Sequence, residues 1–483
     1  MMQTPDSYLP QLAETSQPLY TRLADAIERD IDSGVLPAGS RLPPMRNLAY
    51  DIGVTIGTIN RAYNLIAERG LVVGEVGRGT YVRDREKPVP FPTASTRLAA
   101  PPHKPAQHPV FDLGENNDAV MNLDTTSAIH AGQAKIIAEQ FAEIAARQPH
   151  MLTDYVPGIP PSWREAGSLL LSRPGYAPSP DTIVATNGAH AGIMAVVMTL
   201  TAPGDRIVFE TASYASIARS ATLAGRRVIE AAMDEDGLVP EEFEKLCARQ
   251  HPRLLYLMPS LNNPTLARLP AARRKAIAEI CRRYSVWIIE DAVYAPLSGD
   301  TDPPLASLCP ELTFHVGAMS KTVSASLRAG WIACPPGYAG RVQPAHRMFS
   351  GGGSYPMKEL ASRLILSGEA ERTLQKARTV ISHRHDLLRT ALEGYKLRSN
   401  PTCPFAWLSL PEPWRSGPFR DAVLQRGIMI AHEDDFKPAR SDVTFHAVRI
   451  AFATQYSDER YVKAFAAIRD VLESGVTGHA TII

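Results

Sequence analysis

Residues 317–331, GAMSKTVSASLRAGW, place Lys321 among small residues, with Arg328 seven positions further along the chain. A lysine with room around its amine can form a Schiff base, and an arginine can hold a phosphate group. The run TFHVGA leads into this stretch and is the last of a series that alternates with helical patterns beyond residue 111: TIVAT, RIVFE, RRVIEA, LLYLM and VWIIED. This alternation predicts a mostly parallel sheet covered by helices on both faces.

Polar residues follow several of these runs, at the sheet edge where α/β proteins bind their ligands. One strand passes through Gly188 into an apolar helix, so the N–H groups at its start would face a bound anion. Asn263 follows a second strand, and Asp291 and Tyr294 follow a third. Strand–glycine–helix turns are common, and two adjacent acids at a strand end, here Glu290 and Asp291, often form only a solvated turn. A purely structural role therefore stays open for each of these residues taken singly.

Length and composition set broad limits on the protein. A chain of 483 residues suggests two to four domains at roughly 150 residues per domain. Its residues are 45% hydrophobic and 21% charged, with no apolar run long enough for a membrane span and no secretory signal, so we expect a cytoplasmic protein without membrane contact. The net charge of +1 requires any nucleic-acid contact to come from a local patch. Five scattered cysteines predict reduced thiols and no metal site.

The N-terminal region shows helical patterns followed by a hairpin. Three helices are predicted, over residues 18–33, 44–53 and 54–70. Thr55 can cap the third helix, whose buried face would consist of Ile59, Ala62, Tyr63 and Ile66. The stretch LVVGEVGRGTYVR then predicts two strands joined by a turn with Arg78 at its tip. This is the spacing of a helix-turn-helix with a wing, although a plain three-helix module with an exposed hairpin has the same pattern.

Residues 84–110, DREKPVPFPTASTRLAAPPHKPAQHPV, contain seven prolines and no apolar periodicity. Proline-rich sequence stays extended and semi-rigid, so we interpret this stretch as a linker. A proline-rich loop packed on one domain is the alternative. The chain is thus predicted to have two domains, an α+β domain at residues 17–83 and an α/β domain at residues 111–480.

Residues 17–83 closely resemble the winged helix-turn-helix of the GntR regulators, whose pattern "G..LP.G..LP..R.LA...GV...T..RAY..L...G" matches this sequence nearly position by position. The resemblance implies binding to a double-stranded DNA operator. The residues that would contact DNA are Arg46, Thr55, Thr58, Asn60, Gly77, Arg78 and Gly79. Arginine and asparagine can read base edges, while threonine hydroxyls and glycine N–H groups position the phosphate backbone. Many relatives carry an arginine where this chain has Ile56, so base readout at that point would be weaker or apolar.

The region from residue 111 to residue 480 resembles the fold-type-I aminotransferases that depend on pyridoxal 5'-phosphate (PLP), which also implies a smaller C-terminal subdomain. By this resemblance the cofactor-binding residues are Gly188, Ala189, His190, Tyr214, Asn263, Asp291, Tyr294, Ser320, Lys321 and Arg328. Arg449, in the run HAVRIAFAT, would bind a ligand carboxylate, although a surface strand residue has the same pattern. His190 stands where glutamine is usual, and Met319 stands where an aromatic residue is usual.

The resemblance also implies the role of each cofactor contact. Lys321 would form the internal aldimine, and Asp291 would pair with the pyridinium nitrogen. Asn263 and Tyr294 would form hydrogen bonds with the phenolic oxygen of the cofactor. Arg328 would hold the phosphate together with the backbone at the start of the helix. Tyr214 lies in the ETASYAS stretch and would pack against the pyridine ring.

The order of the two regions resembles the architecture of the MocR regulators. This implies a PLP-dependent transcriptional regulator that senses a small amino compound by aldimine exchange at Lys321. It also implies a homodimer, and a domain-swapped arrangement of that dimer stays open. The alternative is an active amino-acid aminotransferase with an appended DNA-binding module, because every PLP-contacting residue type is present.

Overall fold

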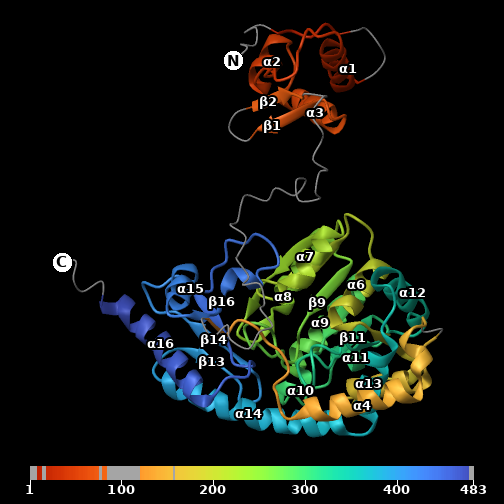
Figure 1. Ribbon diagram of the computed structural model, residues 1–483, viewed down its shortest axis with the longest axis vertical. Coiled ribbons are helices and arrows are strands. Elements are labelled where there is room, and N and C mark those ends of the chain that lie inside the picture. Colours follow the sequence, from red (N-terminus) through yellow and green to blue (C-terminus); the bar gives the residue numbers. More distant parts are fainter. Residues whose placement is uncertain (1–7, 13–17, 76–78, 84–119, 156–157, 478–483) are drawn as a thin grey trace. The chain divides into compact units, whose positions relative to one another are not determined.

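The computed structural model describes residues 8–12, 18–75, 79–83, 120–155 and 158–477 (Figure 1). The chain divides into two compact units, residues 1–113 and 114–483, and each is described by itself. The predicted linker, residues 84–110, lies outside the described residues.

The N-terminal unit contains three helices and a hairpin. The helices are α1 (Leu19–Asp32), α2 (Met45–Asp51) and α3 (Ile56–Glu68). The strands β1 (Val72–Glu75) and β2 (Gly79–Val82) pair in antiparallel fashion. The face predicted for α3 is buried at all four positions: Ile59, Ala62, Tyr63 and Ile66. These residues pack on α1 around Leu23 and Ile27, so the predicted helix-turn-helix with a wing is confirmed as the fold of this unit.

The C-terminal unit is built on a seven-stranded sheet with the strand order β4-β12-β11-β10-β9-β5-β6. The strands are β4 (Ile183–Thr186), β5 (Arg206–Glu210), β6 (Arg227–Ala231), β9 (Leu254–Leu257), β10 (Trp287–Asp291), β11 (Thr313–Ala318) and β12 (Gly330–Ala333). All neighbours pair in parallel except β12, which runs antiparallel to both β11 and β4. The loop from β11 to β12 is too short for a crossover helix, so the chain turns back beside the strand it has just left. The predicted mostly parallel sheet is therefore confirmed.

Helices cover both faces of this sheet, because successive strand residues point to opposite sides. On one side Tyr256 packs with α6 (Gly188–Leu200) and α7 (Ala215–Leu223). On the other side Leu255 packs with α8 (Pro240–Gln250), α9 (Ala271–Tyr284) and the short α11 (Leu305–Leu308). The remaining elements of this part are α4 (Gln133–Arg147), η2 (Pro149–Leu152), α5 (Pro161–Leu171), η3 (Pro180–Thr182), β7 (Met233–Asp234), β8 (Gly237–Leu238), α10 (Ala295–Ser298), α12 (Ala339–Ser350) and α13 (Tyr355–Leu366).

A smaller C-terminal part follows the long helix α14 (Glu369–Ala391). Its sheet has the order β13-β14-β17-β16, from β13 (Leu397–Arg398), β14 (Phe405–Ser409), β16 (Ala431–His432) and β17 (Ala447–Ala451). Around this sheet lie α15 (Ser416–Gln425), η4 (Glu433–Phe436) and α16 (Asp458–Thr477). The strand β3 (Met121–Asn122), close behind the predicted linker, pairs in parallel with β15 (Ile428–Met429). The chain thus enters the C-terminal unit through this smaller part.

All five cysteines are buried, unpaired thiols. Burial raises the pKa of the Cys247 thiol to about 12, so this thiol stays protonated near neutral pH. In the described part of the chain, no helix combines the length and the apolar character that crossing a membrane would require.

Candidate functional site

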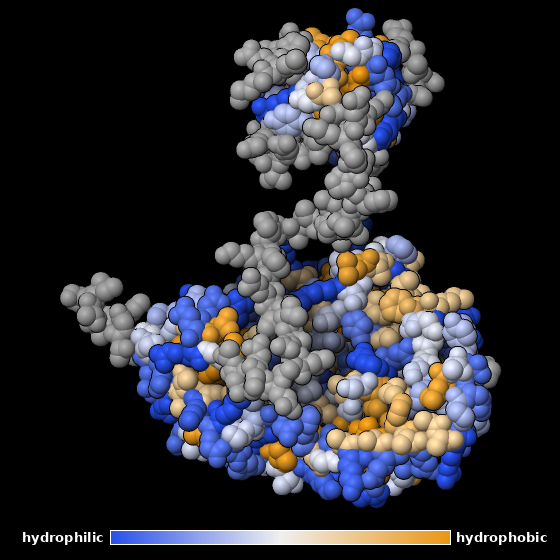
Figure 2. All heavy atoms as spheres, in the orientation of Figure 1, coloured by the Kyte–Doolittle hydropathy of each residue, from blue (hydrophilic) through white to orange (hydrophobic). Residues whose placement is uncertain are grey.

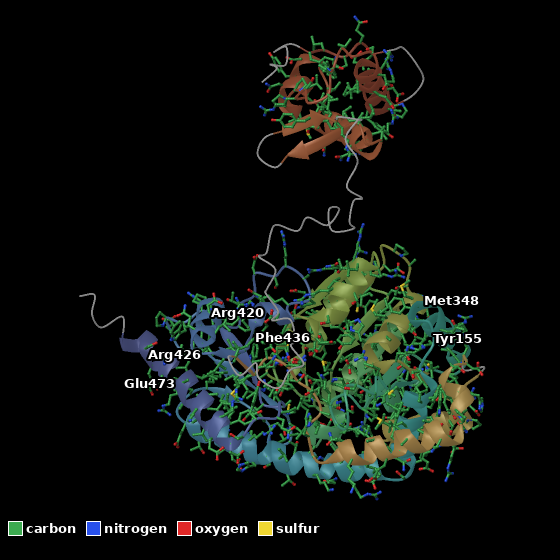
Figure 3. All side chains as sticks on the ribbon, viewed as in Figure 1. Tyr155, Met348, Arg420, Arg426, Phe436 and Glu473 are labelled. Carbon is green, nitrogen blue, oxygen red and sulfur yellow. The ribbon has the colours of Figure 1, made fainter. Side chains whose placement is uncertain are left out.

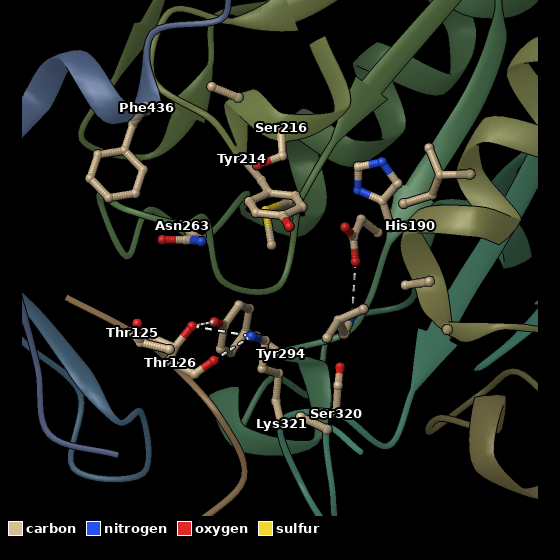
Figure 4. A pocket seen from close by; sticks show the side chains of 18 of the residues that line it. Thr125, Thr126, His190, Tyr214, Ser216, Asn263, Tyr294, Ser320, Lys321 and Phe436 are labelled. Atoms are coloured by element: carbon tan, nitrogen blue, oxygen red, sulfur yellow. Dashed lines mark hydrogen bonds between the residues drawn. The ribbon is translucent and has the colours of Figure 1, made fainter. Parts of the chain in front are cut away.

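A cavity of about 540 Å³ opens at the carboxyl ends of the parallel strands. It is lined by every residue that the sequence predicted for the cofactor and its ligand: Gly188, Ala189, His190, Tyr214, Asn263, Asp291, Tyr294, Ser320, Lys321, Arg328 and Arg449. Figure 4 shows several of these side chains pointing toward one another from different elements. Residues up to 261 positions apart in the chain thus meet at one edge of the sheet, where α/β proteins bind ligands.

Lys321 lies in the loop between β11 and β12. Its amine donates hydrogen bonds to the Thr126 carbonyl oxygen at 2.6 Å and to Thr126 Oγ1 at 3.2 Å (Figure 4). Burial, together with the nearby cations Arg449 and Arg328, lowers the pKa of Lys321 to about 8 against the opposing effect of Asp291. A larger fraction of this amine than of an exposed lysine is therefore uncharged near neutral pH, and the uncharged form is the nucleophilic one.

Asp291 ends β10 and lies deep in the cavity wall. Its Oδ2 accepts a hydrogen bond from the Tyr256 hydroxyl at 2.7 Å, and its Oδ1 accepts one from the Val293 N–H at 3.1 Å. Burial raises the pKa of Asp291, while these two hydrogen bonds and the Lys321 amine oppose the increase. The surrounding donors thus favour the carboxylate form, the form that can hold a protonated ring nitrogen.

A cradle for an anion lies at the start of α6. Gly188 has φ +81°, and the Arg328 guanidinium lies 3.3 Å from the point where a Cβ at this glycine would stand. Gly330 is needed close by, because a Cβ there would lie 2.8 Å from the Gly188 carbonyl carbon. Exposed N–H groups at a helix start together with a guanidinium form a typical phosphate site.

His190 belongs to the first turn of the same helix. Its Nε2 lies 3.0 Å from Ser220 Oγ, and burial, followed by the charge of Arg328, lowers its pKa. The imidazole is therefore neutral near pH 7 and adds no second positive charge to the cradle. Its ring meets the Tyr214 ring edge-on at 6.4 Å between centroids.

Arg449 projects from β17 and is buried. Nη1 donates to Asn263 Oδ1 at 2.7 Å, and Nη2 donates to the Asp124 carbonyl oxygen. The Phe405 and Phe436 rings lie 5.5 and 4.7 Å from the guanidinium carbon. Its Nε has no hydrogen-bond partner among the described residues. A buried guanidinium with a free N–H is suited to bind a carboxylate.

The cavity also contains residues that the sequence analysis missed. Asp124, Thr125, Thr126 and Phe436 line it, and Tyr256 supports it from behind. Thr126 Oγ1 lies 2.7 Å from the Tyr294 hydroxyl, so this phenol is bound to a segment 168 residues earlier in the chain. The pattern NLDTTS carries no signal of this role, because the contact depends on how β3 joins the C-terminal part.

The predicted DNA-contacting residues occupy the N-terminal unit. Thr55 caps α3, accepting from the Thr58 N–H at 3.3 Å, so it fixes the start of this helix. Asn60 and Ile56 are exposed on the same helix. Arg46 lies in α2, and Gly79 begins β2, whereas Gly77 and Arg78 lie outside the described residues.

Comparison with known proteins agrees with both units. Residues 109–462 match the model of aminotransferase class I and II, which covers most of the chain. The chain belongs to this family. Residues 19–82 of this aminotransferase-family chain match the bacterial regulatory proteins of the gntR family. The two units together give it the architecture of MocR-type GntR regulators.

Relatives of this aminotransferase-family protein match it over most of their length. The chain is 26% identical over 470 residues to the uncharacterized HTH-type transcriptional regulator YdeF of Bacillus subtilis, covering 97% of both chains. It is 28% identical over 380 residues to the pyridoxine biosynthesis regulator PdxR of Corynebacterium glutamicum, covering 77% of this chain and 78% of the other. It is 26% identical over 386 residues to the probable rhizopine catabolism regulatory protein MocR of Rhizobium meliloti, covering 76% of each. These similarities support a regulator over an active aminotransferase with an appended DNA-binding module.

A solved structure shares the fold of the larger unit. An archaeal alanine:glyoxylate aminotransferase superposes with a TM-score of 0.67 at 22% identity, covering 74% of this chain and 91% of that one. The predicted fold-type-I arrangement is therefore confirmed for this part of the chain.

Proposed function

We propose that the chain is a DNA-binding transcriptional regulator that uses PLP at Lys321 to sense a small amino compound. The observation that carries this proposal is the gathering of Lys321, Asp291, Arg328 and Arg449 in one cavity of a chain that begins with a gntR-family domain. Such a regulator would bind its operator in the cytoplasm.

The residues of the cavity fit PLP by their chemistry. Arg328 and the N–H groups at the start of α6 would hold the phosphate, and Asp291 would hold the ring nitrogen. Tyr214 would lie against the ring. When bound, PLP supplies an electron-withdrawing ring with an aldehyde that reacts with primary amines.

The ligand class follows from the other end of the cavity. Arg449 would bind a carboxylate through its unpartnered Nε, with the Phe405 and Phe436 rings shielding the contact from water. The ligand is therefore an amino acid or a closely related amino carboxylate. A second candidate is that PLP is itself the signal, which the name of the relative PdxR favours.

We also propose a homodimer. Large apolar side chains are exposed on neighbouring segments of the C-terminal unit, namely Phe141, Leu152, Tyr155, Met348 and Phe349. Figure 3 shows Tyr155 and Met348 on the same edge of this unit, and Figure 2 shows apolar surface along the adjacent helix α4. Exposed apolar side chains gathered on one edge are typical of a subunit interface. Light scattering of the full chain tests this, and a monomer with PLP bound would contradict it.

The central experiment follows the visible absorbance of the cofactor and operator binding together. The operator fragment is one selected by the protein from random DNA. Amino acids are added with and without a 2-oxo acid, and PLP alone is added in a separate series. A sensor should change both signals, and a tenfold change in operator affinity needs only about 1.4 kcal/mol of coupling.

The outcomes separate the alternatives. Sustained consumption of the 2-oxo acid with unchanged operator binding would establish a working aminotransferase instead of a regulator. A response to PLP alone would support the second candidate. Lys321→Ala should abolish the borohydride-trapped adduct, whereas Lys358→Ala should not. Lys358 is the matched control, because burial also lowers its pKa to about 8 but it lies outside the residues that line the cavity.

A further inference from the structure

Thr126 contacts two side chains that line the cavity, Lys321 and Tyr294. Its carbonyl oxygen and Oγ1 both accept from the Lys321 amine, at 2.6 and 3.2 Å. Its Oγ1 also lies 2.7 Å from the Tyr294 hydroxyl. Figure 4 shows these three side chains converging, with the dashed lines meeting at Thr126. One residue therefore holds both the amine and the phenol.

We propose that Thr126 is a positioning residue that holds the Lys321 amine in the cofactor-free protein and has to release it when the cofactor attaches. This proposal rests on the proposed function, since it assumes that Lys321 is the attachment point. Nothing in the sequence pattern around Thr126 assigns it this role.

The argument starts from the protonation state of the amine. Attachment joins the Lys321 nitrogen to the aldehyde carbon of the cofactor with loss of one water molecule, so the neutral amine is the reacting form. The two oxygens of Thr126 accept hydrogen bonds, and an ammonium group is the stronger donor, so they stabilise the charged form. Thr126 therefore disfavours the reacting form.

Other charged groups act on the same amine. Arg449 and Arg328 disfavour the ammonium form, and Asp291 favours it. The Tyr294 ring lies 5.7 Å from the amine, and burial raises the pKa of its phenol, which stays protonated near neutral pH. Removing the Thr126 hydroxyl leaves the three charged groups and the Thr126 carbonyl oxygen in place, but it also takes away the partner of the Tyr294 hydroxyl. A variant that keeps the hydroxyl is therefore needed as a control.

The test measures how fast PLP attaches to the cofactor-free full chain as a function of pH. Protein is stripped of cofactor with hydroxylamine and dialysed, and attachment is followed by visible absorbance and by mass spectrometry of the borohydride-reduced adduct. Thr126→Val removes the hydroxyl and keeps the shape of the side chain, and Thr126→Ser keeps the hydroxyl as a control. Below the midpoint of the pH profile, Thr126→Val should attach PLP roughly tenfold faster, with the midpoint about one pH unit lower.

The possible results are distinct. A wild-type profile in Thr126→Ser with a shifted profile in Thr126→Val supports the proposal. Identical profiles in the wild-type protein and Thr126→Val overturn the role of Thr126 but leave the proposed function intact. Absence of any adduct at Lys321 in the wild-type protein overturns the proposed function itself. Thermal unfolding checks each variant, and Thr126→Ala takes the place of Thr126→Val if the latter does not fold.

Discussion

Replacing Tyr256 with phenylalanine should weaken the binding of PLP by removing support from Asp291. The Tyr256 hydroxyl donates to Asp291 Oδ2 at 2.7 Å, and both side chains are buried, so water cannot take its place. A hydrogen bond to a charged group contributes about 1.5–3 kcal/mol, which corresponds to a roughly 10- to 150-fold weaker affinity. The ring itself stays, so its packing on Phe209 at 5.2 Å between centroids is kept.

The assay is a titration of the cofactor-free protein with PLP at several pH values. The Tyr256 bond holds down the pKa of Asp291, which burial raises, so its loss should raise this pKa further. Affinity in Tyr256→Phe should therefore begin to fall at a higher pH than in the wild-type protein as the solution is acidified. Tyr461→Phe is the matched control, since Tyr461 is equally buried and its hydroxyl donates to the Thr454 carbonyl oxygen at 2.6 Å, away from the cavity. The reasoning is refuted if Tyr256→Phe and Tyr461→Phe bind PLP with the same affinity, whether that affinity equals that of the wild-type protein or is weaker.

Two further predictions concern the N-terminal DNA-binding unit and the stability of the fold. Asn60→Ala, at an exposed position of α3, should weaken operator binding by about 1–3 kcal/mol with an unchanged unfolding temperature, and equal affinities in a gel-shift titration would contradict its role in base recognition. His346 accepts from the Asn187 N–H at 3.0 Å, and burial, with the charge of Lys358, lowers its pKa to about 4. As the pH falls, His346 takes up a proton first in the unfolded chain, near pH 6.5. The free energy of unfolding should therefore be at its full value above that pH and decrease by up to about 3 kcal/mol as the pH falls toward 4. The free energy of unfolding of His346→Gln, measured with urea at several pH values, should lack this decrease. If it falls with pH in parallel with that of the wild-type protein, His346 is not the source of the decrease.

The strands of the large sheet were predictable because they are buried on both faces. Runs such as RIVFE and LLYLM are almost continuously apolar, the pattern expected of central parallel strands, and they became β5 and β9. The direction of β12 was not predicted, because it depends on the path of the preceding loop and not on the composition of the strand. The buried face of α3 was predictable from its helical spacing.

The candidate site was predictable only in part. The residues at strand ends gather in one cavity, as their order along the chain indicated, while their roles toward PLP and DNA stay predictions. Tyr256 could not be singled out, because a tyrosine within an apolar run is indistinguishable from a core residue until its hydroxyl is seen against Asp291. Thr126 was missed for a similar reason, since its partner Lys321 lies 195 residues away in the chain.

The place where the chain enters the C-terminal unit limits how this protein can be divided. The wall of the cavity includes Asp124 and Thr126, which come 14 and 16 residues after the end of the predicted linker. The strand before them is fixed to the smaller part, where the Leu123 N–H donates to the Met429 carbonyl oxygen at 2.7 Å. A fragment that starts after Thr126 would lack one side of its own binding cavity. A chimera that fuses this ligand-binding unit to another DNA-binding domain therefore needs its junction before Val120.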